Sequence, residues 1–190
     1  MNRTMTIVLL VAAGATLPAA QPAESDVVKA FDRRAQEYVE LHRRSEGPIP
    51  PRVASRDMAE VEKLMAAVRA RIRSSGIPKQ GHLLTPDMNL LLRKRIAAVL
   101  TKADLVEIDE DVIEHSPPDM APLRFYEVLP EDAPFIPIPP VLFKTFPTLA
   151  PELRYMILAR ALVIWDEHAN LVVDIGPKLF DPATYGSSNE

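Results

Sequence analysis

The residues LRYMILARALVIWDEHANLVVDI, numbered 153–175, decide the fold of this chain. From Leu153 to Ala159, apolar residues recur at every second position, which is the period of a β-strand. Two further apolar runs follow at 162–165 and 171–175 after short connections. Because short connections join antiparallel strands, the stretch predicts a small antiparallel sheet built from hairpins.

The chain before residue 116 carries the spacing of helices instead. Ser25, Ser55 and Thr85 stand where N-caps are expected, and Pro86 suits a first helical position. Because the break between the last two helices stays open, the sequence predicts three to four helices. The expected ranges are 26–45, 56–74, 86–102 and 104–115.

A proline-rich segment, residues 116–151, links these two parts and holds ten of the 19 prolines. Apolar residues such as Phe135 and Phe146 lie between the prolines, so we expect an extended segment packed on the core. The alternative is a polyproline ligand for the groove of a partner protein. A first strand is expected within 123–129 and a short helical turn over 140–145.

Together these features predict an α+β fold, with three to four helices followed by a small antiparallel β-meander or hairpin sheet. One domain is expected over 24–180, because a chain of 190 residues typically builds one core. Its parts are the helical part (24–115), the proline-rich segment (116–151) and the hairpin part (152–180).

The N-terminus has the pattern of an export signal. Arg3 is followed by an apolar run from Met5 to Ala15 and then by small residues up to Ala23. This pattern predicts a signal peptide over 1–23, cleaved between 15 and 23, and a mature protein in the periplasm or outside the cell. The run is shorter than a membrane span, so no span is expected after cleavage; the alternative is a retained anchor at the membrane edge.

Composition excludes several classes of chemistry. The chain has no cysteine, which rules out disulfides, zinc thiolate sites, iron–sulfur clusters and thiol nucleophiles. The net charge of −4 argues against a nucleic-acid partner, because such surfaces are usually basic. Since the six glycines form neither a dinucleotide nor a phosphate loop, and no serine stands in a nucleophile elbow, no cofactor is expected.

Asp166, His168 and Asp174 are the candidate catalytic residues. Asp166 and His168 are two positions apart, so they would share one face if the strand continued through them. A carboxylate that orients an imidazole is typical of general bases and metal ligands. The alternative is structural: Asp166 can accept backbone hydrogen bonds of its own turn, and Asn170 tolerates a left-handed conformation there.

Four residues are candidate metal ligands. Glu107, Asp111 and His115 are four apart and share one face of the expected fourth helix, and His168 is the other candidate. The alternative for the helix is a solvated acidic face. His42 continues the apolar stripe of the first helix, so we expect a packed or boundary histidine there.

The hairpin part resembles a known group of proteins. The motifs LAPELRY (149–155) and LVIWDEHANLVVD (162–174) resemble the C-terminal part of an uncharacterised family of small exported bacterial proteins. These proteins pair a helical N-terminal half with a C-terminal β-hairpin, usually with glycine at its tip, where this chain has Ala159-Arg160-Ala161. The hairpin is also distantly similar to that of periplasmic RcnB-like proteins, which are linked to nickel and cobalt homeostasis. The resemblance implies export and fold but assigns no ligand residue.

The sequence predicts a non-enzymatic exported protein that acts by protein interaction. Its expected partner is an unknown protein of the cell envelope, bound through the proline-rich segment or an exposed sheet edge. One alternative is a periplasmic metal-handling protein. The other is a small hydrolase that uses Asp166, His168 and Asp174.

Overall fold

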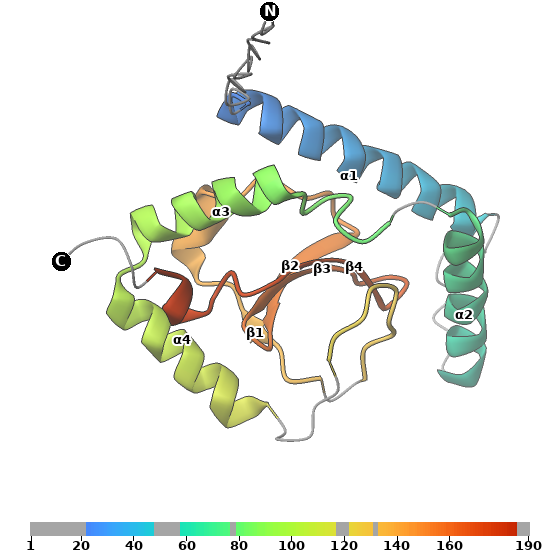
Figure 1. Cartoon of the computed structure of the whole chain (residues 1–190). Helices are drawn as coiled ribbons and strands as arrows, with labels where there is room; N and C mark the ends of the chain where they lie inside the picture. Colours follow the sequence, from blue (N-terminus) through green and yellow to red (C-terminus); the bar gives the residue numbers. More distant parts are fainter. Residues whose placement is uncertain (1–21, 48–57, 77–78, 117–121, 131–132, 186–190) are drawn as a thin grey trace, which may run out of the picture.

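The computed structural model describes residues 22–47, 58–76, 79–116, 122–130 and 133–185, and within them four helices precede a four-stranded antiparallel sheet (Figure 1). The predicted α+β class is confirmed. The helices are α1 (Glu24–Glu46), α2 (Met58–Ser74), α3 (Pro86–Val99) and α4 (Lys102–His115), with short 3-10 helices η1 (Pro140–Lys144) and η2 (Pro182–Tyr185). The strands are β1 (Ile136–Pro137), β2 (Leu153–Leu158), β3 (Ala161–Asp166) and β4 (Leu171–Gly176).

The sheet follows chain order, β1-β2-β3-β4, as short connections predict. Leu158 pairs with Ala161 across the β2–β3 turn, so Ala159 and Arg160 are its two central residues. Both have positive φ, 49° and 64°, the conformation of the tight hairpin turn that usually takes Asn-Gly. Arg160 also donates from its guanidinium to Asp109 of α4, which ties the hairpin tip to the helical part.

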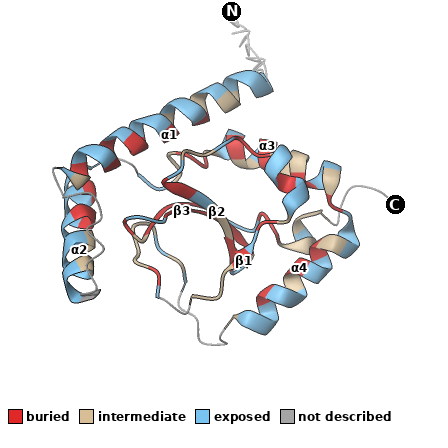
Figure 2. Cartoon of the chain, turned by 180° about the vertical axis from the view of Figure 1, so that it is seen from behind, coloured by how far each residue is buried: buried red, intermediate tan, exposed pale blue. Residues whose placement is uncertain are grey.

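Both faces of the central strands are buried, which explains why β3 and β4 are almost continuously apolar. Leu162 and Ile164 of β3 pack in the main core with residues of α1 and α3. Val163 and Val172 point into a second cluster with Leu129 of the proline-rich segment. Residues of α1 and α3 therefore pack on one face of the sheet, and Leu129 of the proline-rich segment packs on the other. Figure 2 colours the buried residues red on the strands and on parts of the helices.

The strand expected within 123–129 is wrong. This stretch bends, with Tyr126 at φ 61°, and makes two backbone hydrogen bonds to Val172: Tyr126 donates to it and Glu127 accepts from it. Pro122 and Pro130 flank the stretch and cannot donate to a ladder, so the pairing stays local. The helical turn expected over 140–145 is confirmed as η1.

Two of the helices start at residues other than those predicted from the sequence. Thr85 caps α3 as predicted, because its hydroxyl accepts from the amide of Met88 at 3.3 Å. Ser25 is not a cap: α1 begins at Glu24, and the carbonyl of Ala23 accepts the first amides of the helix. A capping box of Thr101 and Asp104 starts α4, and it separates α3 from α4.

Two of the sequence predictions lie outside the described residues. The signal peptide falls almost entirely on residues 1–21, and the Ser55 cap falls within 48–57. Among the helices that the structure describes, none is long and apolar enough to cross a membrane.

Candidate metal-binding site

Asp166, the last residue of β3, connects the sheet to α1. Its side chain is fully buried, and its Oδ2 accepts from the Tyr38 hydroxyl at 2.7 Å and lies 2.5 Å from Nδ1 of His42. Its Oδ1 accepts from the amide of Ala169 at 2.8 Å. One carboxylate therefore closes the β3–β4 turn and binds two side chains of α1.

The spacing on α1 explains why these groups meet. Tyr38, His42 and Glu46 follow one another at intervals of four, so they lie along one face of the helix. Tyr38 and His42 belong to the buried face of α1, and Glu46 ends the helix near the solvent. The last two turns of α1 thus place a phenol, an imidazole and a carboxylate beside the β3–β4 turn.

His42 is held between two carboxylates. Its Nδ1 faces Asp166, and its Nε2 lies 2.9 Å from Oε1 of Glu46. Because each ring nitrogen faces an acceptor, the ring donates at both positions and is the charged imidazolium. Burial alone lowers the pKa of His42, but the hydrogen bonds and negative charges of Asp166 and Glu46 outweigh it and raise the pKa to about 9.

Tyr38 is the neutral member of this network. Its buried position, and next the negative charge of Asp166, raise the pKa of its hydroxyl well above the usual value. The phenol is therefore a fixed hydrogen-bond donor that holds Oδ2 of Asp166 in place.

His168 completes the cluster from the turn. Its Nδ1 lies 3.6 Å from Oε1 of Glu46, and its ring centroid lies 5.9 Å from that of His42. One ligand atom from each of His42, Glu46 and His168 lies within 4.8 Å of the other two, which is close enough for one metal ion to contact all three. His42 is fully buried, whereas the side chains of Glu46 and His168 are 40% and 41% exposed, so the cluster opens to solvent on one side.

Several contacts fix the turn that carries His168. The buried Arg69 of α2 donates to the carbonyl of Ala169 at 3.1 Å. Asn170 has φ 47°, and its side chain accepts from the indole of Trp165 at 3.0 Å and donates to the carbonyl of Leu129 at 2.9 Å. Asn170 adopts the left-handed conformation that an asparagine tolerates. The position of His168 is set by α2 as well as by the sheet.

Glu152 is a further buried carboxylate on this side of the molecule. Its Oε1 accepts from Arg43 of α1 at 2.9 Å, and its Oε2 is buried with no hydrogen-bond partner. Burial raises its pKa, but the hydrogen bond and charge of Arg43, together with the charge of His42, lower it overall. Because Arg43 pairs with Glu152 and offsets its charge, Asp166 is the buried carboxylate that acts directly on His42.

The structure brings two of the three candidate catalytic residues together. Asp166 and His168 belong to one network, but through His42 and Glu46, because β3 ends at Asp166 and 167–170 form a turn. Asp174 has a different environment. Its carboxylate accepts from the backbone amides of Gly81, Leu83, Leu84 and Ile175 at 2.7–2.9 Å.

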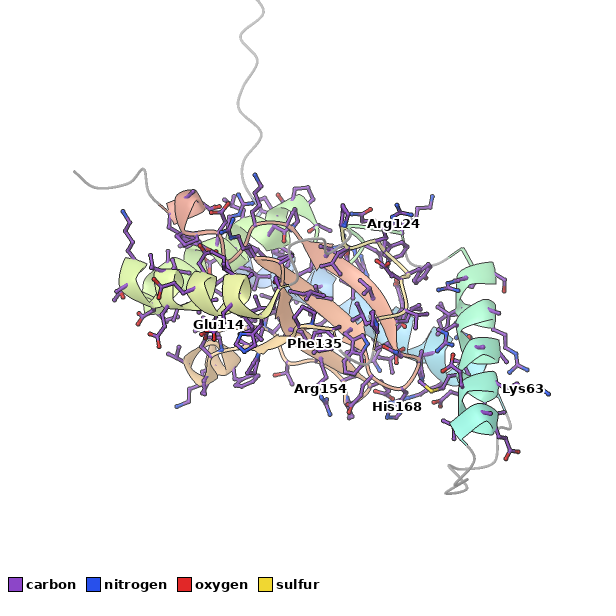
Figure 3. The ribbon with its side chains drawn as sticks, turned by 90° about the horizontal axis from the view of Figure 1, so that it is seen from below. Lys63, Glu114, Arg124, Phe135, Arg154 and His168 are labelled. Atoms are coloured by element: carbon purple, nitrogen blue, oxygen red, sulfur yellow. The ribbon has the colours of Figure 1, made fainter. Side chains whose placement is uncertain are left out.

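The candidate ligands on α4 do not form such a group. His115 is exposed, and its Nδ1 lies 2.8 Å from the carbonyl of Asp111 in its own helix. Within the described ranges, His42, Glu46 and His168 are the only trio of potential ligands whose ligand atoms lie within 4.8 Å of one another. The ligand atoms of Glu107, Asp111 and His115 do not come this close together. Figure 3 shows α4, with Glu114 labelled, on the opposite side of the molecule from His168.

The sequence predicted His168 as a ligand but missed Glu46 and the bonding of His42. The signal available in sequence is the four-residue spacing of Tyr38, His42 and Glu46. This spacing predicts a shared helix face, but it does not reveal which distant turn that face meets.

No family model matches the chain, and neither the curated proteins nor the solved structures include a match. The resemblance described from the hairpin motifs therefore stays a prediction.

Proposed function

We propose that this protein handles a divalent metal ion, which it binds through His42, Glu46 and His168, and that it does so in the periplasm or outside the cell, where the predicted signal peptide would direct it. The observation that carries the proposal is the geometry of the cluster: three ligand atoms lie within 4.8 Å, and Asp166 stands behind His42. Metal-binding histidines usually donate the N–H of their second ring nitrogen to a carboxylate in this way.

Binding requires a simple exchange at His42. A metal ion needs the lone pair of Nε2, so it would replace the proton that this nitrogen shares with Glu46, and that proton would be released to the solvent. Glu46 and His168 are half-exposed, so their side chains can adjust to the ion while His42 stays fixed.

Ion binding is better supported than catalysis. A hydrolase would need a concave substrate site at its reacting groups. A groove of about 480 Å³ is lined by described residues of 137–167, and its lining includes neither His42, Glu46 nor His168.

Metal titration of the purified protein, prepared without a polyhistidine tag, tests the proposal. Zn²⁺ at about 100 times its dissociation constant should stabilise the fold by about 2.7 kcal/mol, measured as a rise in melting temperature. Glu46→Gln and His168→Asn should lose most of this rise, because each removes one exposed ligand. His115→Asn is the matched control, since it removes an exposed histidine on α4 and should leave the rise unchanged.

Two results would overturn the proposal. One is a melting temperature that no divalent metal changes. The other is a rise in melting temperature that persists in both ligand variants and disappears in His115→Asn, which would mean that the metal binds at α4.

A second function, the binding of a partner protein, is favoured by the 480 Å³ groove. It lies where the proline-rich segment, with Ile138 and Phe143, meets β2, with Leu153 and Tyr155. β1 is only two residues long and pairs with residues 156–157, so in the described chain no strand covers residues 153–155 of β2 on that side. We propose an extended apolar segment of an envelope protein as the occupant, added as a strand beside β2.

In-cell crosslinking in the native host tests this second function. The side chains of Phe143 and Ile113 are both largely exposed, at 62% and 59%, so each can be changed to Asp without disturbing the core. A partner bound in the groove should be lost in Phe143→Asp and kept in Ile113→Asp, which lies on α4. Equal recovery of the partner from both variants would exclude the groove.

A further inference from the structure

We infer that the cluster of His42, Glu46 and His168 selects a borderline divalent transition metal, the class of Zn²⁺, Co²⁺ and Ni²⁺. The cluster holds this ion in an exchangeable position. Asp166 is the positioning residue that sets the affinity of the cluster for the ion. This inference rests on the proposed metal binding, and it adds the class of ion and the role of Asp166, which is bonded to the ligand His42.

The donor set excludes the common hard cations. His42 and His168 offer imidazole nitrogens, and Glu46 offers a carboxylate oxygen. Ca²⁺ takes six to eight oxygen ligands and Mg²⁺ a regular octahedron of oxygens, so neither gains from two nitrogens. Imidazole with carboxylate suits Zn²⁺ and its neighbours, and two histidines with one glutamate are a known zinc ligand set.

One ligand of the three is fixed before the ion arrives. Nδ1 of His42 is bound to Asp166, so Nε2 must point toward Glu46 and the solvent side. Asp166 is itself held by the Tyr38 hydroxyl and the Ala169 amide. This arrangement sets both the ring orientation and the nitrogen that is available to the ion, which are the roles of an outer-sphere carboxylate.

The open side of the cluster makes the ion exchangeable. Among the described residues the site has three ligands, and two of them, Glu46 and His168, are about 40% exposed. Structural zinc sites are closed by four protein ligands, whereas a site with three leaves a position for water or another ligand. The ion can therefore enter and leave from the side of Glu46 and His168 without unfolding of α1 or the sheet.

Competition titrations test the choice of ion. The metal-free protein is titrated with Zn²⁺, Co²⁺, Ni²⁺, Ca²⁺ and Mg²⁺, and the visible absorption of bound Co²⁺ reports coordination by nitrogen. We expect Zn²⁺ to displace Co²⁺ completely, and Ca²⁺ and Mg²⁺ at large excess to leave the spectrum unchanged. If Ca²⁺ or Mg²⁺ displaced Co²⁺ from a site that requires His168, the inferred class of ion would be wrong, whereas the proposed function would stand.

Exchange is tested with a chelator. Excess chelator should remove Co²⁺ while the folded state persists, measured by circular dichroism. Release only on unfolding would overturn the exchangeable site.

Asp166→Asn tests the positioning residue. Loss of an outer-sphere partner typically weakens metal binding about 10–100-fold, and we expect a loss in this range. Tyr38→Phe is the milder variant, which frees one bond to Asp166 and should shift affinity in the same direction. Asp109→Asn is the control, because it removes a carboxylate paired with Arg160, at the hairpin tip, and should leave affinity unchanged.

The possible outcomes distinguish the role of Asp166 from metal binding itself. Wild-type affinity in folded Asp166→Asn and Tyr38→Phe would overturn the role of Asp166 alone. If Asp166→Asn does not fold, Tyr38→Phe with the Co²⁺ affinity and the Co²⁺ spectrum of the wild type would do the same. No binding of any metal to the unchanged protein would overturn the proposed function itself.

Discussion

Oδ2 of Asp166 lies 2.5 Å from Nδ1 of His42, although the two residues are 124 positions apart in the chain. Both side chains are fully buried, so this pair joins the end of α1 to the β3–β4 turn in the core of the protein. A buried ion pair is costly to break, because removal of one partner leaves the other charge without compensation. The contact therefore serves the fold and the candidate site at once.

The metal-free protein should lose stability as the pH rises from neutral to alkaline. The pKa of His42 is raised to about 9 in the folded state, above 6.5 in the unfolded state. Its contribution is therefore fully present below pH 6.5 and is lost as the pH rises through 9, by about 3 kcal/mol. Urea unfolding in the presence of a chelator, at about pH 6 and about pH 10, measures this loss.

The comparison variant for this prediction is His42→Gln, which cannot titrate. The groups that face His42 are Asp166 and Tyr38 in the core and Glu46, His168 and Glu152 toward its edge. If His42→Gln keeps the slope of the wild type between these two pH values, one of the other groups carries the pH dependence and the prediction is wrong.

Asp174→Ala should be among the most destabilising single changes in the protein. Its carboxylate accepts the amides of Gly81, Leu83 and Leu84, which precede α3, and this holds the entry to that helix against β4. A buried donor left without an acceptor costs about 1–3 kcal/mol. The loss of the three buried bonds, from the amides of Leu83, Leu84 and Ile175, should therefore lower the free energy of unfolding by at least about 3 kcal/mol. Chemical denaturation measures it.

Asp111→Ala provides the control for Asp174→Ala. Asp111 lies on the exposed face of α4, where a surface change usually alters stability by less than about 0.5 kcal/mol. A loss of similar size in the two variants would mean that the buried amides find other partners.

Most of the fold could be predicted from local pattern, and most of the site could not. The alternation in 153–159 and the apolar runs after it fix the hairpins, because residues adjacent in sequence pair there. His42 was expected to be a packed histidine, and it is fully buried. Its bond to Asp166 depends on where α1 crosses the β3–β4 turn, which the period of the helix does not encode.

The strand expected within 123–129 illustrates the same limit. Its apolar residues are real contacts of the second core cluster, since Leu123 and Leu129 both pack there. Their spacing suited a strand, but the backbone bends at Tyr126 and only local bonds to Val172 form. The apolar side chains of 123–129 thus predicted that this stretch is buried. Its backbone conformation could not be predicted, because it depends on the bonds to β4.

Gly176→Ala should destabilise the protein even though the backbone of Gly176 suits any residue. This glycine ends β4 opposite Leu162, and a Cβ built on it would lie 2.7 Å from Oδ1 of Asn89 and 2.7 Å from Cδ1 of Leu179. Both distances are shorter than side chains tolerate, and overpacking of this kind costs about 1–3 kcal/mol. Chemical denaturation should show this loss, because the side chains of Asn89 and Leu179 must leave their packed positions to make room.

The double variant Gly176→Ala with Asn89→Ala separates crowding from other causes. Removal of the Asn89 amide frees one of the two crowded contacts, so the double variant should be more stable than the sum of the two single changes predicts. Asn89 also donates to the carbonyl of Leu84 at 2.8 Å, so the Asn89→Ala single variant is measured to account for that bond. Simple additivity of the two changes would show that Asn89 gives way freely and that Leu179 alone limits the space at Gly176.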